Sequence, residues 1–183
     1  MVDQKPETFP WHVPIKVDDI PEAGRHFALT TNEATRAAVA RYADVRSVER
    51  LEASFDVARR GRAGLRVTGE VRGLIGQNCV VSLDPIENDV IETVAVDFVP
   101  APQGQTAGPM EVSVHDSDDD DVPEYLVDGG VDLGGLAVEF LILGIDPYPR
   151  KPGVDFLAPP TDSGESNPFA ALASLKKPPG GDK

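Results

Sequence analysis

Two runs of strict alternation within residues 51–72 constrain the fold of this chain more than any other feature of its sequence. In residues 51–57, and again in residues 65–71, nearly every apolar side chain is followed by a polar one. A period of two is typical of a strand that is buried on one face only. Because the glycine-bearing segment 60–64 separates the runs, we expect a β-hairpin with one polar face.

Basic and acidic residues are concentrated in different parts of the chain, and the predicted hairpin lies in the arginine-rich part. Residues 36–72 contain nine arginines and five acidic residues, whereas residues 73–149 contain 16 acidic residues and neither Lys nor Arg. The formal net charge is −14, so a general basic surface is not expected, and DNA is not expected as a partner. Sorted charges indicate charged partners, unless the arginine-rich and acidic zones pair with each other in the fold.

The remaining elements are predicted from shorter patterns. Short strands are expected at residues 11–17, 26–29 and 78–83, and a longer β-branched strand at residues 90–99. The capping-box spacing of Thr30 and Glu33 predicts that a helix begins there. Asp132 is expected to cap a second helix that ends near Leu143, before Gly144.

Strands joined by short turns, with helices to the sides, predict an α+β fold built mainly on an antiparallel β-sheet with flanking helices. We expect a flexible N-terminus at residues 1–10 and a single α+β domain at residues 11–147, which contains a loop and acidic insert at 100–130. The Pro/Gly-rich residues 148–183 are expected to be an extended or disordered tail with a short helix at 168–176. The polar N-terminus, and the absence of an apolar run near the ~20 residues that span a bilayer, predict a cytoplasmic protein without a membrane partner.

No pattern in the chain indicates catalysis, and we expect no catalytic residue, no metal and no cofactor. The three histidines are scattered, and the single cysteine, Cys79, lies in an apolar segment where a small buried side chain is the expected role. Asp116–Asp121 resembles the start of a calcium loop, but Asp121 stands at the sixth position and Val127 at the twelfth. The alternative is a small metal-dependent hydrolase that uses His115 and this acidic insert as ligands.

Arginine is the residue type that most clearly suggests a ligand, because its planar guanidinium matches the geometry of phosphate and can hold an RNA backbone. Few aromatic side chains accompany the arginines, so recognition by base stacking is not indicated. The alternative is a solvated strand face, or a set of partners for the acidic residues. The candidates for nucleic-acid binding are Arg46, Arg50, Arg59, Arg60, Arg62, Arg66 and Arg72. The candidates for holding a basic partner are Asp118, Asp119, Asp120 and Asp121.

Four segments of the chain resemble the YceD family, the large ribosomal RNA subunit accumulation proteins, in a form similar to alphaproteobacterial members. The segments are residues 76–85, 131–134, 138–153 and 167–172. Their order matches the family: a strand with a cysteine, an acidic insert, and a helix that ends before a proline. The family-motif residues are Cys79, Asp132, Leu133, Glu139 and Pro147.

This resemblance implies a non-enzymatic factor that supports accumulation of 23S rRNA and assembly of the large ribosomal subunit. The implied partners are 23S rRNA or a pre-50S particle, with a basic ribosomal or assembly protein as a further candidate. Many family members carry Cys-x-x-Cys in the strand, but here the second position is Ser82. A zinc-binding role therefore does not carry over, and the resemblance brings no catalytic residue.

Overall fold

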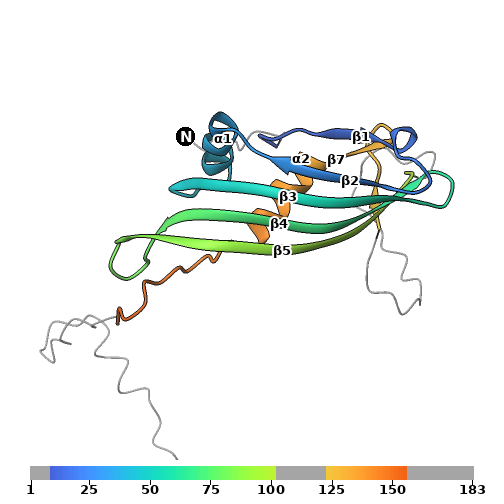
Figure 1. The fold of residues 1–183 in the computed structure, drawn as a ribbon. Coiled ribbons are helices and arrows are strands. Elements are labelled where there is room, and N and C mark those ends of the chain that lie inside the picture. Colours follow the sequence, from blue (N-terminus) through green and yellow to red (C-terminus); the bar gives the residue numbers. More distant parts are fainter. Residues whose placement is uncertain (1–8, 102–122, 156–183) are drawn as a thin grey trace, which may run out of the picture.

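Two β-sheets and two α-helices make up the part of the chain that the computed structural model describes, residues 9–101 and 123–155 (Figure 1). The elements are, in chain order, β1 (Pro14–Lys16), the 3-10 helix η1 (Val17–Asp19), β2 (Arg25–Thr30), α1 (Glu33–Tyr42), β3 (Ser47–Arg60), β4 (Gly64–Asn78), β5 (Pro85–Val99), β6 (Glu124–Tyr125), β7 (Gly130–Asp132) and α2 (Leu133–Leu143). Neither α-helix is long and apolar enough to cross a membrane, within the residues described.

The larger sheet has the strand order β2-β3-β4-β5-β6, and its pairs are antiparallel except for β5 with β6, which is parallel. β1 and β7 form a separate antiparallel pair. The long strands lie side by side in front of α2, while α1 packs against β3 (Figure 1). The expected α+β class, built mainly on an antiparallel sheet, is confirmed.

The hairpin predicted from alternation is formed by β3 and β4. Phe55 pairs with Gly69 and Val57 with Val67, so the alternating apolar side chains of both strands point to the same face. Both strands extend well beyond the predicted runs. The reason is that β3 and β4 each have a neighbour on both sides, so their backbone groups stay paired even where the alternation weakens.

Gly69 permits the tight packing in the middle of this hairpin. Its φ is +154°, and a Cβ atom at this position would lie 2.0 Å from the carbonyl oxygen of Ser54. No other residue type fits here without moving the backbone. The opposing Phe55 is fully buried.

The hydrophobic core lies between the inner face of the sheet and α2. Asp132 caps this helix as predicted, because its carboxylate accepts hydrogen bonds from the N–H groups of Gly134 and Gly135. Leu141 of α2 packs over Gly73 of β4, where an added Cβ atom would lie 2.4 Å from the leucine side chain. The fully buried side chains in this layer include Phe55, Leu51, Leu65, Ile75, Val67, Val71, Leu133 and Leu141.

Two local predictions were wrong. Helix α1 is capped by Asn32, whose side chain accepts the N–H of Thr35, whereas Thr30 is the last residue of β2 and pairs with Glu52. The strand expected at 78–83 does not form, since β4 ends at Asn78 and the chain turns back at Leu83, which has a φ of +63°. The helix expected at 168–176 and the acidic insert lie outside the described residues.

Candidate nucleic-acid interface

The outer face of the large sheet, opposite α2, carries rows of polar side chains set by the strand register. Arg66 of β4 stands between Ala58 and Asp97, and Arg72 stands between Glu52 and Ile91. Paired residues in a sheet point to the same face, so the register places the arginines and the acidic residues together. The charged side chains that the register places on this outer face are Arg50, Glu52, Asp56, Arg60, Arg66, Glu70, Arg72, Glu87, Asp89 and Asp97.

Each of the four outer-face arginines, Arg50, Arg60, Arg66 and Arg72, has an acidic partner. Arg50 Nη2 lies 3.2 Å from Asp89 Oδ1, and Arg66 Nη1 lies 3.2 Å from Asp97 Oδ2. Arg60 also pairs with Asp97, and Arg72 pairs with Glu70. The four arginine side chains are about half exposed, so these ion pairs contribute little net stability and can exchange for another anion.

Among the described residues, the other three arginine candidates form no ion pair with the carboxylates of the outer face. Arg59 donates from Nε to the carbonyl oxygen of Ile20 at 2.6 Å. Arg46 precedes β3, and its guanidinium lies against Gly76 at the far end of the hairpin. Arg62 is exposed in the turn between β3 and β4, with no ion-pair partner among the described residues. The structure therefore brings together four of the seven candidates.

Asp97 is the one charged residue that is buried in the described part of the chain, with 7% of its surface exposed. Its Oδ2 atom pairs with both Arg60 and Arg66. Its Oδ1 atom is buried as well but has no hydrogen-bond partner. An orphaned buried carboxylate oxygen is unusual, because leaving such an acceptor unpaired destabilises the fold by about 1–3 kcal/mol.

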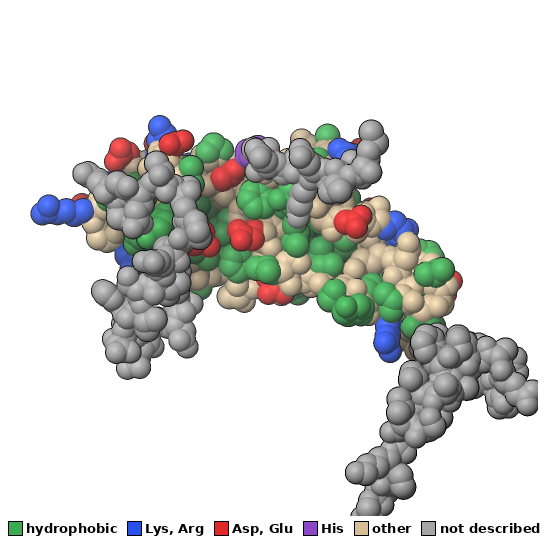
Figure 2. Space-filling view, turned by 180° about the vertical axis from the view of Figure 1, so that it is seen from behind, with side chains coloured by type: hydrophobic (Ala, Val, Ile, Leu, Met, Phe, Trp, Pro, Cys, Tyr) green, Lys and Arg blue, Asp and Glu red, His purple; other side chains and the backbone are tan. Residues whose placement is uncertain are grey.

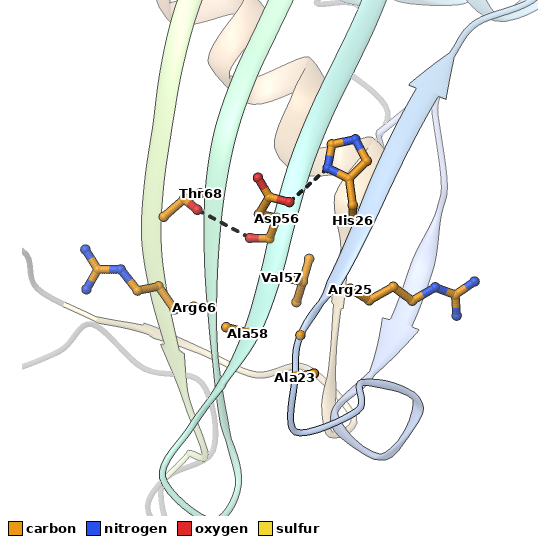
Figure 3. A pocket seen from close by; sticks show the side chains of 9 residues that line it. Ala23, Arg25, His26, Asp56, Val57, Ala58, Arg66 and Thr68 are labelled. Atoms are coloured by element: carbon orange, nitrogen blue, oxygen red, sulfur yellow. Dashed lines mark hydrogen bonds and ion pairs between the residues drawn. The ribbon is translucent and has the colours of Figure 1, made fainter.

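A shallow cavity of about 250 Å³ opens beside Arg66 on the same face. His26 Nδ1 of β2 lies 2.9 Å from Asp56 Oδ1 of β3, and Thr68 donates to the backbone carbonyl of Asp56 (Figure 3). Arg66 lies on one side of these residues and Arg25 on the other (Figure 3). The cavity therefore offers both hydrogen-bond donors and acceptors, while the guanidinium groups of Arg66 and Arg25 point away from it on either side (Figure 3).

The opposite face, which carries α2, has a different character. Acidic side chains lie there among hydrophobic ones, while Lys and Arg side chains lie mainly toward the rim (Figure 2). Burial and the nearby Glu139 both raise the pKa of Glu124.

Asp118–Asp121 and His115 lie outside the described residues. Within the described residues, no group of three or more His, Cys, Asp and Glu side chains is placed to hold a metal ion.

Cys79 begins the turn after β4 and joins it to the segment that follows α2. Its fully buried Sγ atom accepts the backbone N–H groups of Lys151 and Ser82, each at 3.4 Å. Hydrogen bonds lower the pKa of Cys79 to about 6: first that of the Lys151 N–H, and then those of the Ser82 hydroxyl and the Ser82 N–H. Lys151 Nζ also lies 2.9 Å from Asp84 Oδ2. The hydrogen bond from Lys151 to this sulfur therefore connects the start of the predicted tail with the end of β4.

The other family-motif residues hold the fold or lie on its surface. Asp132, besides capping α2, lies 2.6 Å from His12 Nδ1 and accepts the N–H of Val13 at 2.7 Å. Leu133 is fully buried. Glu139 and Pro147 are exposed.

Sequence reasoning did not identify Asp97, His26, Asp56 or Thr68 as parts of the interface. A signal was present for two of them, because period-two alternation in the hairpin places Asp56 and Thr68 on the same polar face as Arg66. Nothing in the sequence shows that Asp97 is paired with Arg66, since that depends on the register between β4 and β5.

Comparison with known proteins gives one match. The family model described as "Large ribosomal RNA subunit accumulation protein YceD" matches residues 67–176, which is more than half of the chain. No curated protein and no solved structure matches the chain.

Proposed function

The chain belongs to the YceD family of large ribosomal RNA subunit accumulation proteins, and on that premise we propose that it supports accumulation of 23S rRNA and assembly of the large ribosomal subunit. It does so in the cytoplasm, by binding the rRNA or a pre-50S particle, and it catalyses no reaction. The residues that contact RNA are the outer-face arginines.

The observation that carries this proposal is that four half-exposed arginines share one polar sheet face. Guanidinium groups on neighbouring strands present several N–H donors toward solvent, a geometry that suits successive phosphates of a nucleic-acid backbone. The acidic partners hold these side chains in place while the RNA is absent. When RNA binds, phosphate oxygens take over or share the arginine donors.

The overall charge of −14 limits how this binding works. A protein so acidic is repelled by RNA at long range, so the contact is local and orients the acidic α2 face away from the RNA. Phosphate contacts by a few arginines release counterions, which makes the affinity fall as salt rises. We therefore expect weak, strongly salt-dependent binding that is directed to one region of an assembling particle.

Sedimentation of cell extracts tests the proposal. We expect the wild-type chain to migrate with pre-50S particles at low salt and to leave them at high salt. A variant with Arg50, Arg66 and Arg72 each changed to Gln should migrate with free protein at both salt concentrations. A matched variant with Lys16, Arg41 and Arg150 changed to Gln loses the same charge from exposed positions elsewhere and should behave as wild type.

The second candidate partner is a basic ribosomal or assembly protein, held by the acidic part of the chain. The acidic α2 face, with Glu139 exposed beside Glu124, favours it (Figure 2). Asp118–Asp121 remain proposed contacts for such a partner. Nuclease treatment separates the two candidates: association with RNA is lost after digestion, whereas a protein contact survives it.

A further inference from the structure

We propose that Arg60, Arg66 and Asp97 form a binding site for one nucleotide of single-stranded RNA. The two guanidinium groups bind a phosphate, and Asp97 Oδ1 accepts a hydrogen bond from the ribose 2′-hydroxyl. This inference rests on the proposed function, which it deepens by naming the nucleotide-binding residues and the group that distinguishes RNA from DNA.

Asp97 holds the two arginines in a defined arrangement. One of its oxygens, Oδ2, pairs with a guanidinium from β3 and with another from β4. Because a guanidinium has five N–H donors, each arginine keeps most of its donors for a ligand. Arg60 and Arg66 are 49% and 50% exposed, so those donors are within reach of solvent. The cluster of two arginines and one carboxylate keeps a net charge of +1, which suits a phosphodiester.

The second oxygen of Asp97 indicates what else the ligand contains. Oδ1 is buried, accepts no hydrogen bond, and lies next to the two arginines that would hold the phosphate. A ligand that adds a donor beside its phosphate satisfies this oxygen once the half-exposed guanidinium groups turn from Oδ1 toward the phosphate while keeping their ion pairs with Oδ2. The ribose 2′-hydroxyl is such a donor, and it is the group by which proteins distinguish RNA from DNA.

The neighbouring cavity provides room for the rest of the nucleotide. Arg66 lines it, together with Asp56, His26 and Thr68, and its volume of about 250 Å³ admits a base or a sugar. Asp56 and Thr68 supply polar atoms that can meet the edge of an unstacked base (Figure 3). An unpaired nucleotide enters this cavity more readily than a rigid duplex does.

The surroundings favour RNA over a protein partner at this site. Protein interfaces have an apolar centre, but only two large hydrophobic side chains are exposed on the outer face among the described residues, Ile91 and Tyr125, which pairs with Val99 at the edge of the sheet. Ile91 lies in the row of Arg72, six residues from Asp97 along β5, and Tyr125 lies on the edge strand β6. The two exposed side chains stand apart and form no apolar centre, so the arginine-bearing end of the face matches a phosphate backbone better than a protein interface.

The test is fluorescence anisotropy with the full-length chain at low salt. The probes are a labelled 12-nucleotide single-stranded RNA of mixed sequence, the DNA of the same sequence, and the RNA with 2′-O-methyl groups throughout. We expect the RNA to bind at least fivefold more tightly than the DNA. The 2′-O-methyl RNA should bind like the DNA, because it lacks the hydroxyl donor.

Variants locate the binding site. Changing both Arg60 and Arg66 to Gln should weaken RNA binding about tenfold and reduce the slope of log affinity against log salt by about 1.4, as expected for two lost contacts to a single strand. The matched control changes Lys16 and Arg41 to Gln, which removes two exposed basic side chains that are not among the outer-face arginines. It should lose less than threefold.

The Asp97→Asn variant tests whether Asp97 contributes to the preference for RNA over DNA through its hydrogen bond or only through its charge. The substitution removes a negative charge beside two arginines, so affinity for DNA should rise. The ratio of RNA to DNA affinity should fall to about one, whereas a purely electrostatic role would leave that ratio unchanged. If this variant fails to fold, the 2′-O-methyl probe tests the same hydrogen bond with the wild-type chain.

Two results overturn the inference: equal binding of RNA, DNA and 2′-O-methyl RNA, or equal losses in the two double variants. The proposed function stands after either result if the wild-type chain still migrates with pre-50S particles at low salt. If the wild-type chain binds none of the probes and also fails to migrate with pre-50S particles, the proposed RNA contact itself is wrong.

Discussion

Cys79 shows how a single side chain links two distant parts of the chain. Its sulfur accepts N–H groups from Ser82 and from Lys151, which lies 72 residues away. The family resemblance identified this cysteine as a motif residue, but the sequence did not indicate its contact with Lys151. A backbone donor has no side-chain signature, so only the fold reveals the contact.

The lowered pKa of Cys79 predicts a pH-dependent stability. The folded thiol titrates at about 6, whereas an unperturbed one titrates at 9.0. The unfolded chain therefore binds more protons between these values, and stability should rise from pH 6 to pH 9. The contribution is complete above the unfolded pKa and is lost as the pH falls through 6. Urea unfolding midpoints at pH 6, 7.5 and 9 measure it.

Cys79→Ala should abolish this part of the pH dependence, and the variant should be less stable than wild type at pH 9. Ser82→Ala keeps the backbone N–H but removes the hydroxyl that also lowers the pKa of Cys79, so this variant should retain only part of the rise. An equal increase in stability with pH in wild type and Cys79→Ala would show that the thiolate has no such role.

At the scale of elements, alternation identified the β3–β4 hairpin, because burial on one face requires a period of two. The cap of α2 was also predictable, since Asp132 precedes the apolar run directly. The cap of α1 was not: Thr30 and Asn32 are both good capping residues, and the choice depends on the pairing of Thr30 with Glu52 in the sheet.

The close approach of β3 and β4 at Gly69 predicts a large effect of a small side chain. Gly69→Ala places a methyl group on the carbonyl of Ser54 and should destabilise the fold by about 3 kcal/mol. Gly61→Ala is the matched control: Gly61 has a φ of +63° but no atom within 4 Å of an added Cβ, so about 1 kcal/mol is expected. Thermal unfolding of both variants measures the difference, and similar losses would contradict this account.

The cap of α2 predicts a difference between two substitutions of one residue. Asp132→Ala removes the acceptor for Gly134 and Gly135 and should cost about 1–2 kcal/mol, whereas Asp132→Asn retains a good cap and should cost less. Chemical denaturation at neutral pH measures both losses, and equal stability of the two variants would refute the capping role.

Because the pKa of Asp132 is lowered in the folded chain, we expect the stability difference between wild type and the Asp132 variants to depend on pH. Burial alone would raise the pKa of Asp132, but hydrogen bonds from Val13, His12 and Gly135 outweigh burial and lower that pKa. The stability that the carboxylate adds is therefore present above its unfolded pKa and is lost as the pH falls through the lowered, folded one. The advantage of the wild-type chain over the Asp132→Asn variant should disappear on acidification, which denaturation of both chains at neutral and acidic pH measures.

At the scale of the whole molecule, the sequence separates an arginine-rich zone, residues 36–72, from an acidic zone, residues 73–149. The structure brings parts of these two zones into contact. Pairing of β4 with β5 brings Arg66 beside Asp97, and Arg50 of β3 reaches Asp89. The alternative that the two zones pair in the fold therefore holds for part of the arginines. Counting charges along the chain does not reveal such pairs, because strand register decides which distant residues meet.

The consequence for the interface is that its arginines are held in position by acidic residues and remain half exposed. Under the proposed function, a surface of this kind would bind phosphates only where several contacts form together, which suits one region of a large RNA better than RNA in general. The net charge of −14 also opposes nonspecific binding of the protein to RNA, because the two carry charge of the same sign.

The most direct measurement of the central claim is the ratio of large-subunit to small-subunit rRNA in cells that lack the chain and carry a plasmid-borne copy. The wild-type copy and the control with Lys16, Arg41 and Arg150 changed to Gln should restore the ratio. The copy with Arg50, Arg66 and Arg72 changed to Gln should leave it low while the protein is present at wild-type level. Full restoration by that copy would contradict the claim that the outer-face arginines carry the function.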